Sequence, residues 1–231
     1  MKVLITGANR GIGLEFVRQL AARGERVFAT CRNPTEAIEL TDLQIQYPDR
    51  VSITGLDVTD PRSIAESHRA ISAQTETLDL LINNAGINID DGGFGALDLE
   101  TMQSILTVNS IAPMLSTQQY LDLIKVGSKP KIVNISSGNG SLTNLNTTGH
   151  YSYSASKAAL NMYSLRLSHD LKNAGVIVIM LHPGWVKTDM GGPNASITPQ
   201  DSIKSMLQFI DSLTLRNSGG YFDYTGQTLP W

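Results

Sequence analysis

The sequence predicts an α/β protein in which a doubly wound parallel sheet is covered by helices on both faces. Short, nearly continuous apolar runs rich in β-branched residues recur along the chain, as expected for strands that are buried on both sides. Longer segments with apolar residues three and four positions apart lie between these runs and are typical of amphipathic helices. Their alternation favours a parallel sheet of about seven strands.

The elements can be placed in order. Strands are predicted at residues 2–6, 26–30, 51–58, 78–82, 131–136 and 176–181. Helices are predicted at residues 12–24, 61–74, 99–125 and 153–175. Gly24 and Gly175 stand where the first and last of these helices should stop, because glycine readily adopts the left-handed conformation of a helix end. Pro113 lies inside the third helix and should kink it.

Size and composition limit the classes of protein that fit. The 231 residues show no linker or break in composition, so we expect a single domain over residues 1–231. Hydrophobic residues make up 41% and charged residues 17% of the chain, which suits a large buried core. The net charge is -3 and no Lys/Arg run occurs, which argues against nucleic acid or a membrane surface as a partner.

Two features bear on location. The apolar run at the start is too short for a signal-peptide core, and no segment reaches the apolar length of a membrane span. Cys31 is the sole cysteine, so a disulfide framework within the chain is impossible, as is usual in a reducing compartment. These features predict a cytoplasmic protein.

The stretch TGANRGIG, residues 6–13, joins the first strand to the first helix. Its glycines, Gly7, Gly11 and Gly13, allow a tight turn and a close approach of the backbone to a pyrophosphate. The following helix would direct its free amides and positive dipole end at the anion. The spacing differs from the commonest dinucleotide fingerprint. Its place after the first strand favours a phosphate site over a plain glycine-rich turn.

The end of the second predicted strand bears on the choice of cofactor. Proteins that bind NAD commonly carry an acidic residue here, about 20 residues after the glycines. This chain has Arg32, which could hold a 2′-phosphate through a charge-assisted bond. Arg10 could add a second positive contact. Each could also be an ordinary solvated charge, but together they favour NADP(H) over NAD(H).

Tyr153 and Lys157 are four residues apart, which on a helix places them on one face about 6 Å apart along the axis. Tyr151 is six residues from Lys157 and would face elsewhere. An unperturbed tyrosine has a pKa of about 10, and a neighbouring ammonium group should make it easier to ionise. The pair could serve acid–base chemistry, although an exposed Tyr/Lys contact would look the same.

Several motifs follow one another in the order of a known family. They are TGANRGIG, DVTD at 57–60, NNAG at 83–86, Asn109, IVNISS ending at Ser137, YSASK at 153–157 and HPGWVKTDM at 182–190. In this series the chain resembles the short-chain dehydrogenases/reductases, which have a Rossmann fold. The stretch HPGWVKTDMGG and the ending YFDYTGQTLPW resemble the sniffer-like and C-factor-like carbonyl reductases of that family.

The resemblance implies an NADPH-dependent carbonyl reductase or alcohol dehydrogenase. Tyr153 would donate a proton to the carbonyl oxygen, and Lys157 would hold the nicotinamide ribose. Ser137 would give a hydrogen bond to the developing alkoxide, and Asn109 would help to hold a water on a proton path from Lys157. The implied cofactor contacts are Gly7, Asn9, Arg10, Gly11, Ile12, Gly13, Arg32, Asp57, Val58, Asn83, Ala85, Gly86, Tyr153, Lys157, Pro183, Gly184, Val186 and Thr188.

Two neighbouring serines compete for one role. Adjacent strand residues face opposite ways, so we expect only one of Ser136 and Ser137 to reach the site, and the resemblance points to Ser137. The segment from Ser137 to Tyr153 is a few residues longer than is usual in the family. Its polar, glycine-rich residues 138–150 are expected to bulge as a loop beside the pocket.

Residues 188–200 are predicted to form a substrate loop. The stretch MGGPNAS at 190–196 consists of small residues and should be flexible, and Thr198 with Pro199 predicts a helix start. The resemblance implies a lid over the substrate, with an ordinary surface loop as the alternative. His150, His169 and His182 have no partners at metal-ligand spacing, so no catalytic metal is expected.

Two questions stay open at this level. A non-catalytic regulator or developmental signalling protein that senses NADP(H) would share the fold, although it would need no proton donor. A homo-oligomer, a dimer or tetramer, is expected from the family, with candidate contacts at Met102, Leu106, Met162 and Leu165. Core packing would explain these four residues equally well. The sequence does not reveal the carbonyl substrate.

Overall fold

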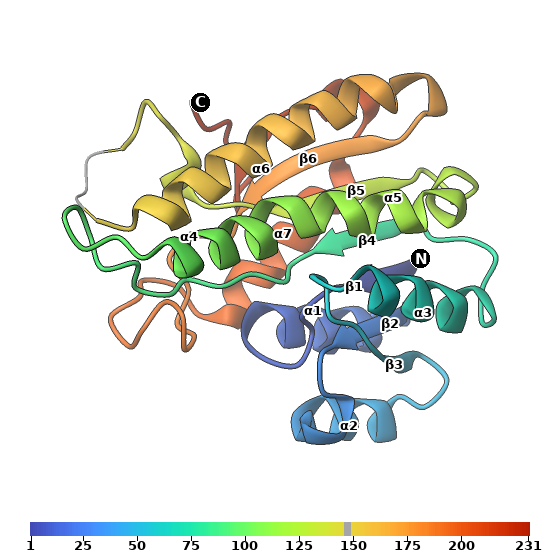
Figure 1. Ribbon diagram of the computed structural model, residues 1–231. Coiled ribbons are helices and arrows are strands. Elements are labelled where there is room, and N and C mark those ends of the chain that lie inside the picture. The colour runs from blue at the N-terminus through green and yellow to red at the C-terminus, as the bar shows by residue number, and fades with distance from the viewer. Residues whose placement is uncertain (146–148) are drawn as a thin grey trace.

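The computed structural model describes residues 1–145 and 149–231. Seven strands form one sheet in the order β3-β2-β1-β4-β5-β6-β7, and each neighbouring pair is parallel. Helices cover both faces of this sheet (Figure 1). The predicted fold class, a doubly wound Rossmann-type α/β sheet, is therefore confirmed.

The strands are short and mostly buried. They are β1 (Lys2–Ile5), β2 (Arg26–Cys31), β3 (Val51–Gly55), β4 (Leu80–Asn83), β5 (Lys131–Ile135), β6 (Ile177–His182) and β7 (Tyr221–Asp223). The first six lie within or overlap the apolar runs of the sequence. The seventh was not predicted, because its three residues are too few to show a pattern.

The helices follow the predicted order, except that α2 is additional and the predicted helix over residues 99–125 is divided into α4 and α5. They are α1 (Gly11–Ala22), α2 (Ile38–Gln46), α3 (Pro61–Ser72), α4 (Leu99–Leu106), α5 (Ala112–Lys125), α6 (Tyr151–Asp170) and α7 (Pro199–Ser212). The helix α7 starts as its sequence predicts, with the Thr198 hydroxyl accepting from the Asp201 amide at 3.1 Å. Gly24 follows the end of α1 with φ of 90°, which explains why that helix stops there. The helix α6 stops earlier than predicted, at Asp170, and Gly175, with φ of 71°, ends the 3-10 turn Lys172–Ala174 that comes after it. The helix α2 was not predicted.

Alternate residues of β1 pack into two separate hydrophobic cores, one on each face of the sheet. Val3 and Ile5 of β1 face a cluster that contains side chains of α1, α2 and α7. Leu4 between them faces the opposite side and joins a cluster with Ile71 of α3 and Tyr120 of α5. This alternation is the reason that the strands are apolar along their whole length.

The long third helix of the sequence is broken in the middle. A π-helical turn, Thr107–Ile111, separates α4 from α5, with Ala112 donating to the Thr107 carbonyl. Pro113 has no N–H to offer the Asn109 carbonyl four residues earlier. The irregularity expected at Pro113 thus takes the form of a wider turn just before it, and it falls on a predicted catalytic residue.

The strand order creates the place for a site. From β1 the chain builds the sheet outward through β2 and β3, and then returns to the other side of β1 with β4. Connections therefore leave the carboxyl ends of β1 and β4 in opposite directions, and open α/β sheets bind ligands in the crevice at this point. The glycine turn and NNAG follow these two strands directly.

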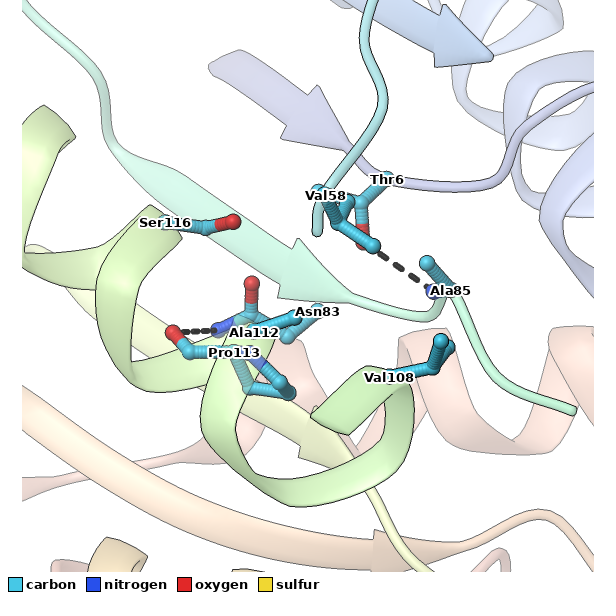
Figure 2. Close-up of a pocket in the computed structure, with 8 residues that line it drawn as sticks. All are labelled: Thr6, Val58, Asn83, Ala85, Val108, Ala112, Pro113 and Ser116. Atoms are coloured by element: carbon cyan, nitrogen blue, oxygen red, sulfur yellow. Dashed lines mark hydrogen bonds between the residues drawn. The ribbon is translucent and has the colours of Figure 1, made fainter. Parts of the chain in front are cut away.

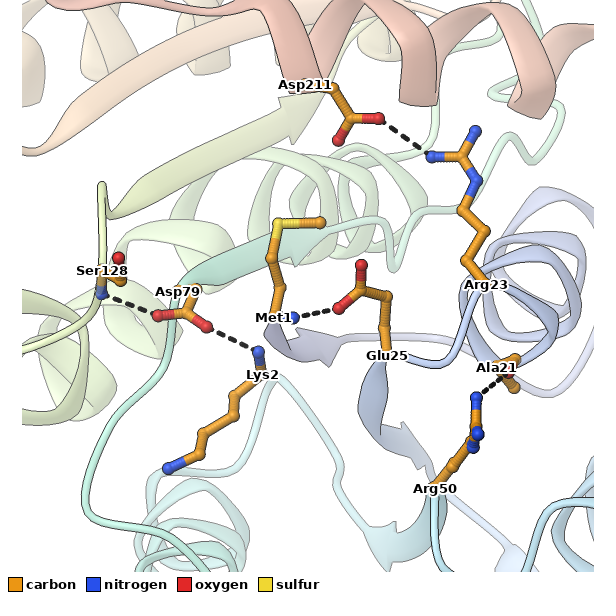
Figure 3. A network of polar contacts seen from close by, with 9 residues as sticks. All are labelled: Met1, Lys2, Ala21, Arg23, Glu25, Arg50, Asp79, Ser128 and Asp211. Atoms are coloured by element: carbon orange, nitrogen blue, oxygen red, sulfur yellow. Dashed lines mark hydrogen bonds and ion pairs between the residues drawn. The ribbon is translucent and has the colours of Figure 1, made fainter.

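Polar contacts connect segments at the amino ends of the strands, on the side of the sheet away from the crevice (Figure 3). The Asp79 carboxylate accepts from the Lys2 amide at 2.7 Å and from the Ser128 amide at 2.7 Å. It thereby joins the starts of β1 and β4 to the segment before β5. Arg23 and Asp211 form an ion pair of 3.1 Å between the end of α1 and the end of α7.

Asp79→Ala should lower the free energy of unfolding by about 1–2 kcal/mol, because two backbone amides lose a charged acceptor. Asp79→Asn keeps one acceptor oxygen and should lose about half as much. The measurement is urea unfolding of the three proteins. An unchanged midpoint and slope for Asp79→Ala would show that water replaces the carboxylate without loss.

Candidate active site

The glycine turn packs directly on the backbone that follows β4. Gly7 has φ of 64°, and a Cβ built there would lie 2.9 Å from the Ala85 Cα. A Cβ on Gly13 would lie 2.3 Å from the Gly7 oxygen. Both contacts are too short for any side chain, so these positions need glycine. The result is a turn whose surface is bare backbone, which a pyrophosphate could approach closely.

Hydrogen bonds hold the glycine turn against the NNAG segment, residues 83–86. The Thr6 hydroxyl accepts from the amides of Asn84 and Ala85, both at 3.0 Å, and Figure 2 shows it pointing at Ala85. The Asn84 side-chain amide donates to the carbonyls of Thr6 at 2.9 Å and Gly7 at 2.8 Å. The two carboxyl ends at the switch point are therefore held in a fixed geometry.

The start of α1 offers free donors beside the turn. Its cap residue, Arg10, makes no side-chain capping bond, and no acidic residue lies in the first turn. The amides of Gly11, Ile12 and Gly13 thus lack a side-chain acceptor and favour an anion. Asn9 is exposed next to them. This cradle fits the pyrophosphate of a dinucleotide.

The far end of the crevice carries charge of both signs. Arg32 is exposed directly after β2, and Asp57 is half-buried after β3. Burial acts to raise the pKa of Asp57, but hydrogen bonds from Thr59 and the charge of Arg32 outweigh it and lower the pKa. Val58 beside Asp57 is buried. The predicted residues for the adenosine end, Arg32, Asp57 and Val58, thus border one region.

Arg10 contacts the predicted substrate loop in this structure. Its Nη1 lies 3.7 Å from Asp189 Oδ2 in the predicted substrate loop, with both side chains well exposed. The same loop touches the glycine turn at a second place, where a Cβ on Gly11 would lie 3.5 Å from the Thr188 methyl. Arg10 therefore joins the glycine turn to the predicted substrate loop.

Lys157 is the buried cation of the site. Its Nζ donates to the Ile135 carbonyl at 2.8 Å, at the carboxyl end of β5, and the residue is 5% exposed. A Cβ on Gly86 would lie 3.8 Å from this nitrogen. Burial lowers the pKa of Lys157 to about 8, because the charged form is held out of water.

Tyr153 lies on the same face of α6, as its spacing predicts. The Lys157 Nζ stands over its ring, 5.7 Å from the ring centre. Burial raises the pKa of Tyr153, and a hydrogen bond with the Ser137 side chain opposes this shift. The net shift of the Tyr153 pKa is therefore opposite in direction to the shift expected from the ammonium group alone. Desolvation of the phenolate dominates, and the phenol stays protonated at neutral pH.

The two serines face different partners. Ser136 Oγ donates to Asn161 Oδ1 at 2.6 Å and is buried against α6. The Ser137 side chain interacts with Tyr153 and accepts from the Asn139 amide at 3.2 Å. Only Ser137 is therefore beside the tyrosine, as the alternation of strand residues predicts. The longer segment that follows does not displace it.

That segment begins with a short 3-10 turn, Gly138–Gly140, and then runs over the surface. The Thr143 hydroxyl donates to the Trp231 carbonyl at 2.6 Å, which fixes residues 141–145 against the last described residues. Residues 146–148, in the middle of the predicted bulge, lie outside the described residues.

Asn109 sits in the π turn and clamps the segment after NNAG. Its Oδ1 accepts from the Ile87 amide at 2.8 Å, and its Nδ2 donates to the Ile87 carbonyl at 2.8 Å and to Ser156 Oγ at 3.1 Å. The side chain is thus fully used within the protein. Only its backbone carbonyl, which Pro113 leaves without the usual α-helical donor, could hold a water.

The segment after β6 completes the crevice. Gly184 has φ of 83°, and a Cβ there would lie 3.1 Å from the Tyr224 ring. Pro183 accepts through its carbonyl from Ser202 Oγ at 2.7 Å, which ties the segment to α7. Val186 is buried and forms an isolated parallel bridge with Ile197.

The predicted substrate loop is more strongly braced than its small residues indicate. Lys187 donates through its amide to the Ile197 carbonyl at 2.9 Å, across the base of the loop. The Trp185 indole donates to the Gly191 carbonyl at 2.7 Å, and the Thr188 hydroxyl accepts from the Gly191 amide at 3.2 Å. The stretch predicted to be flexible is therefore cross-linked by hydrogen bonds.

One predicted cofactor residue turns its side chain away. The Asn83 amide donates to Asn134 Oδ1 at 2.8 Å and to Thr117 Oγ1 at 3.0 Å, between the sheet and α5. Figure 2 shows it in a small pocket that Pro113 and Ser116 also line. Its side chain braces β4 and β5, so only its backbone could touch a cofactor.

A family model described as short chain dehydrogenase matches residues 1–198. This chain belongs to the short-chain dehydrogenase family. The family identified from the motifs is thereby confirmed, and the chain is an oxidoreductase of that family.

Within the described part of the chain, no helix is long and apolar enough to cross a membrane. Among the same residues, no His, Cys, Asp and Glu side chains gather in a group able to hold a metal ion.

Several known proteins are similar over most of the chain. An NADPH-bound carbonyl reductase from chicken fatty liver has a TM-score of 0.95 and 39% identity, covering 100% of this chain and 98% of that chain. The carbonyl reductase Sniffer of D. melanogaster has a TM-score of 0.94 and 33% identity, covering 100% and 99%. C-signal of Myxococcus xanthus is 40% identical over 162 residues, which are 70% of this chain and 98% of that protein.

Two side chains near the site were not predicted from the sequence. Tyr221 of β7 is buried, and its hydroxyl donates to the Ser137 carbonyl. Burial raises the pKa of Tyr221 to about 12, so it acts as a fixed donor rather than an acid. Asp91, after β4, accepts from the Ser152 amide at the start of α6. Both contacts join segments far apart in sequence, and no local pattern signals them.

The lowered pKa of Lys157 predicts a pH dependence of stability. Between about pH 8 and pH 10.5 the Lys157 amine is protonated in the unfolded chain and neutral in the folded chain. The contribution of Lys157 to the free energy of unfolding therefore increases with pH over this range. The stability of wild type relative to Lys157→Met should therefore increase across this range, by about 3 kcal/mol at most. Denaturant unfolding of both proteins at pH 7, 8.5 and 10 measures this. A constant difference would mean that the Lys157 pKa is unshifted.

Proposed function

We propose that this protein is an NADPH-dependent carbonyl reductase, or in reverse an alcohol dehydrogenase, with Tyr153 as the acid–base residue. The observation that carries the proposal is the meeting of Tyr153, Ser137 and Lys157 at the carboxyl edge of the sheet, beside the glycine turn. The similarity to carbonyl reductases supports the same reaction type.

The cofactor of the proposal is NADP(H), which when bound supplies a hydride to the carbonyl carbon. The pyrophosphate would lie on the glycine turn and the α1 amides, and Arg32 would hold the 2′-phosphate. Asp57 and Val58 would flank the adenine. An arginine in place of a carboxylate removes the repulsion that a 2′-phosphate would meet.

The reacting oxygen needs a proton and a hydrogen bond. A protonated Tyr153 would give its proton to the carbonyl oxygen as that oxygen becomes an alkoxide. Ser137 would donate a hydrogen bond to the same oxygen, and such preorganised donors stabilise charge that appears in the transition state. Tyr221 supports this arrangement, because its bond to the Ser137 carbonyl fixes the backbone there.

Lys157 would serve two purposes. Its ammonium group would hold the nicotinamide ribose hydroxyls, and it would stabilise the phenolate left on Tyr153 by its charge. With a pKa of about 8, it is also poised to release a proton near neutral pH. A water on the Asn109 carbonyl would connect it to solvent. This role falls to the backbone of Asn109, because the side chain is occupied by Ile87 and Ser156.

The outer parts of the protein complete the proposal. Residues 188–200 would cover the substrate, and their contacts with Arg10 and Gly11 support a link between that loop and the cofactor turn.

A homo-oligomer is also proposed. Met162 is 59% exposed on the outer face of α6, which leaves it available to a second subunit. Met102, Leu106 and Leu165 are half-buried.

A second candidate is a regulator or signalling protein that binds NADP(H) without turnover. The similarity to C-signal of Myxococcus xanthus favours it. The presence of Ser137, Tyr153 and Lys157 in one arrangement argues for the enzyme, because a sensor would need the cofactor cradle and no proton donor.

Tyr153→Phe should bind NADPH as wild type does and lose most of its turnover, because the ring still packs while the proton donor is gone. General acid–base catalysis typically contributes about a hundredfold or more. Tyr151→Phe is the matched control, since this tyrosine is exposed and packs near Phe94. Steady-state turnover with saturating NADPH measures both. Near wild-type turnover of Tyr153→Phe would remove Tyr153 from its role.

Arg32→Asp should weaken NADPH binding by about one to two powers of ten and leave NADH unchanged or better bound. The 2′-phosphate is the part of NADPH that NADH lacks, so Arg32 should act on the difference between them. Added salt should reduce the wild-type preference, because the site is exposed. Dissociation constants for both cofactors at two ionic strengths test this. Equal affinity of wild type for both cofactors would contradict the NADP(H) assignment.

A further inference from the structure

The helix that carries Tyr153 begins without a cap of its own. Its first residue is Tyr151, and the preceding His150 has φ of 52° and makes no side-chain capping bond. The amides in the first turn of a helix have no partner within the helix and need an acceptor from elsewhere. The acceptor that His150 fails to supply comes from a distant segment.

Asp91 supplies it from the loop after β4. Its Oδ2 accepts from the Ser152 amide at 2.7 Å, and the residue is only 3% exposed. The hydrogen bond from that amide is the main reason that the pKa of Asp91 lies below its usual value, so the buried carboxylate is charged. A negative charge at a helix N-terminus is also favoured by the helix dipole.

The loop is shaped to bring this carboxylate inward. Gly92 has φ of 82°, and a Cβ there would lie 2.2 Å from the Ala96 oxygen, so the chain turns sharply after Asp91. The Asp98 amide donates to the Asp91 carbonyl at 3.3 Å and closes the loop. At the tip, Phe94 is 87% exposed, with its ring centre 6.3 Å from that of Tyr151.

We propose that Asp91 is a positioning residue for the reaction: it fixes the first turn of α6 and so sets where the Tyr153 hydroxyl stands. This inference rests on the proposed function, in which Tyr153 is the proton donor. Tyr153 follows Ser152 directly in the chain. The next turn is held separately, by Asn109 on Ser156 and by the bond of Lys157 to Ile135.

Tyr153 therefore lies between two anchors on the same helix. Loss of the second anchor would disturb the lysine as well, whereas loss of the Asp91 anchor would release only the turn that bears the tyrosine. A displacement of about 1 Å at a reacting group can cost as much as a hundredfold in rate. Asp91 should act on the chemical step and not on cofactor affinity.

The central test is Asp91→Ala, with kcat for NADPH-dependent carbonyl reduction and the NADPH dissociation constant measured on the full-length chain. We expect kcat to fall roughly tenfold while the dissociation constant changes less than about twofold. Asp91→Asn retains an acceptor oxygen in the same place and should recover most of kcat, since asparagine caps helices as well as aspartate. Asp91→Glu keeps the charge but moves it, and its kcat should be lower than that of Asp91→Asn.

Asp98→Ala is the matched control. Asp98 lies in the same loop and caps α4 in the same way, accepting from the Thr101 amide at 2.7 Å, but α4 does not carry the tyrosine. It should lose stability with little change in kcat. Phe94→Ala tests the loop tip and should leave kcat unchanged, because the exposed ring of Phe94 gives no hydrogen bond to the first turn of α6.

A kcat of Asp91→Ala within about twofold of wild type would overturn the inference. It would also be overturned if Asp98→Ala or Phe94→Ala lowered kcat equally, or if Asp91→Ala changed KM alone. If Asp91→Ala does not fold, the other two variants decide the question. A kcat of Asp91→Glu equal to or higher than that of Asp91→Asn would then overturn the inference. Failure of the proposed function looks different, because Tyr153→Phe would then keep its turnover.

Discussion

The hydrogen bond from Lys157 to the Ile135 carbonyl is the contact on which the rest of the site depends. A charged ammonium group is costly to bury, and this carbonyl at the open carboxyl end of β5 gives it a partner that a continuing strand would have consumed. The bond draws α6 against the crevice between β1 and β4. Tyr153 and Ser137 meet there because one is four residues before the lysine and the other is two residues beyond the carbonyl.

The crevice is rigid for a related reason. Glycines at positions 7 and 13 let the first turn lie in contact with the backbone after β4, and Thr6 and Asn84 lock the two together. Hydrogen bonds therefore join the two halves of the sheet at the point where a dinucleotide would cross it. A stiff crevice keeps donor groups in place without reorganisation, and this is the property that electrostatic catalysis requires.

The parts that could be predicted from sequence have local causes. Strands buried on both faces are apolar along their length, glycines mark the turns, and Tyr153 and Lys157 are one helical turn apart. The unpredicted parts depend on partners far away in the chain. Asp91 in NIDDGGFG has the sequence of an exposed loop, yet it is buried by a helix 61 residues later. Tyr221 lies in a strand too short to show a pattern. Spacing also says nothing of burial, so the direction of the Tyr153 pKa was missed.

The most direct test of the account is a product analysis with wild-type protein and NADPH that carries deuterium at the transferable position. A panel of aldehydes, ketones and quinones would be supplied, and the products examined by mass spectrometry and NMR. The account predicts that NADPH is consumed only when a carbonyl compound is present, and that an alcohol forms from at least one aldehyde or ketone with deuterium on its carbinol carbon. No consumption with any member of the panel, while NADPH still binds, would contradict the enzyme and favour the sensor.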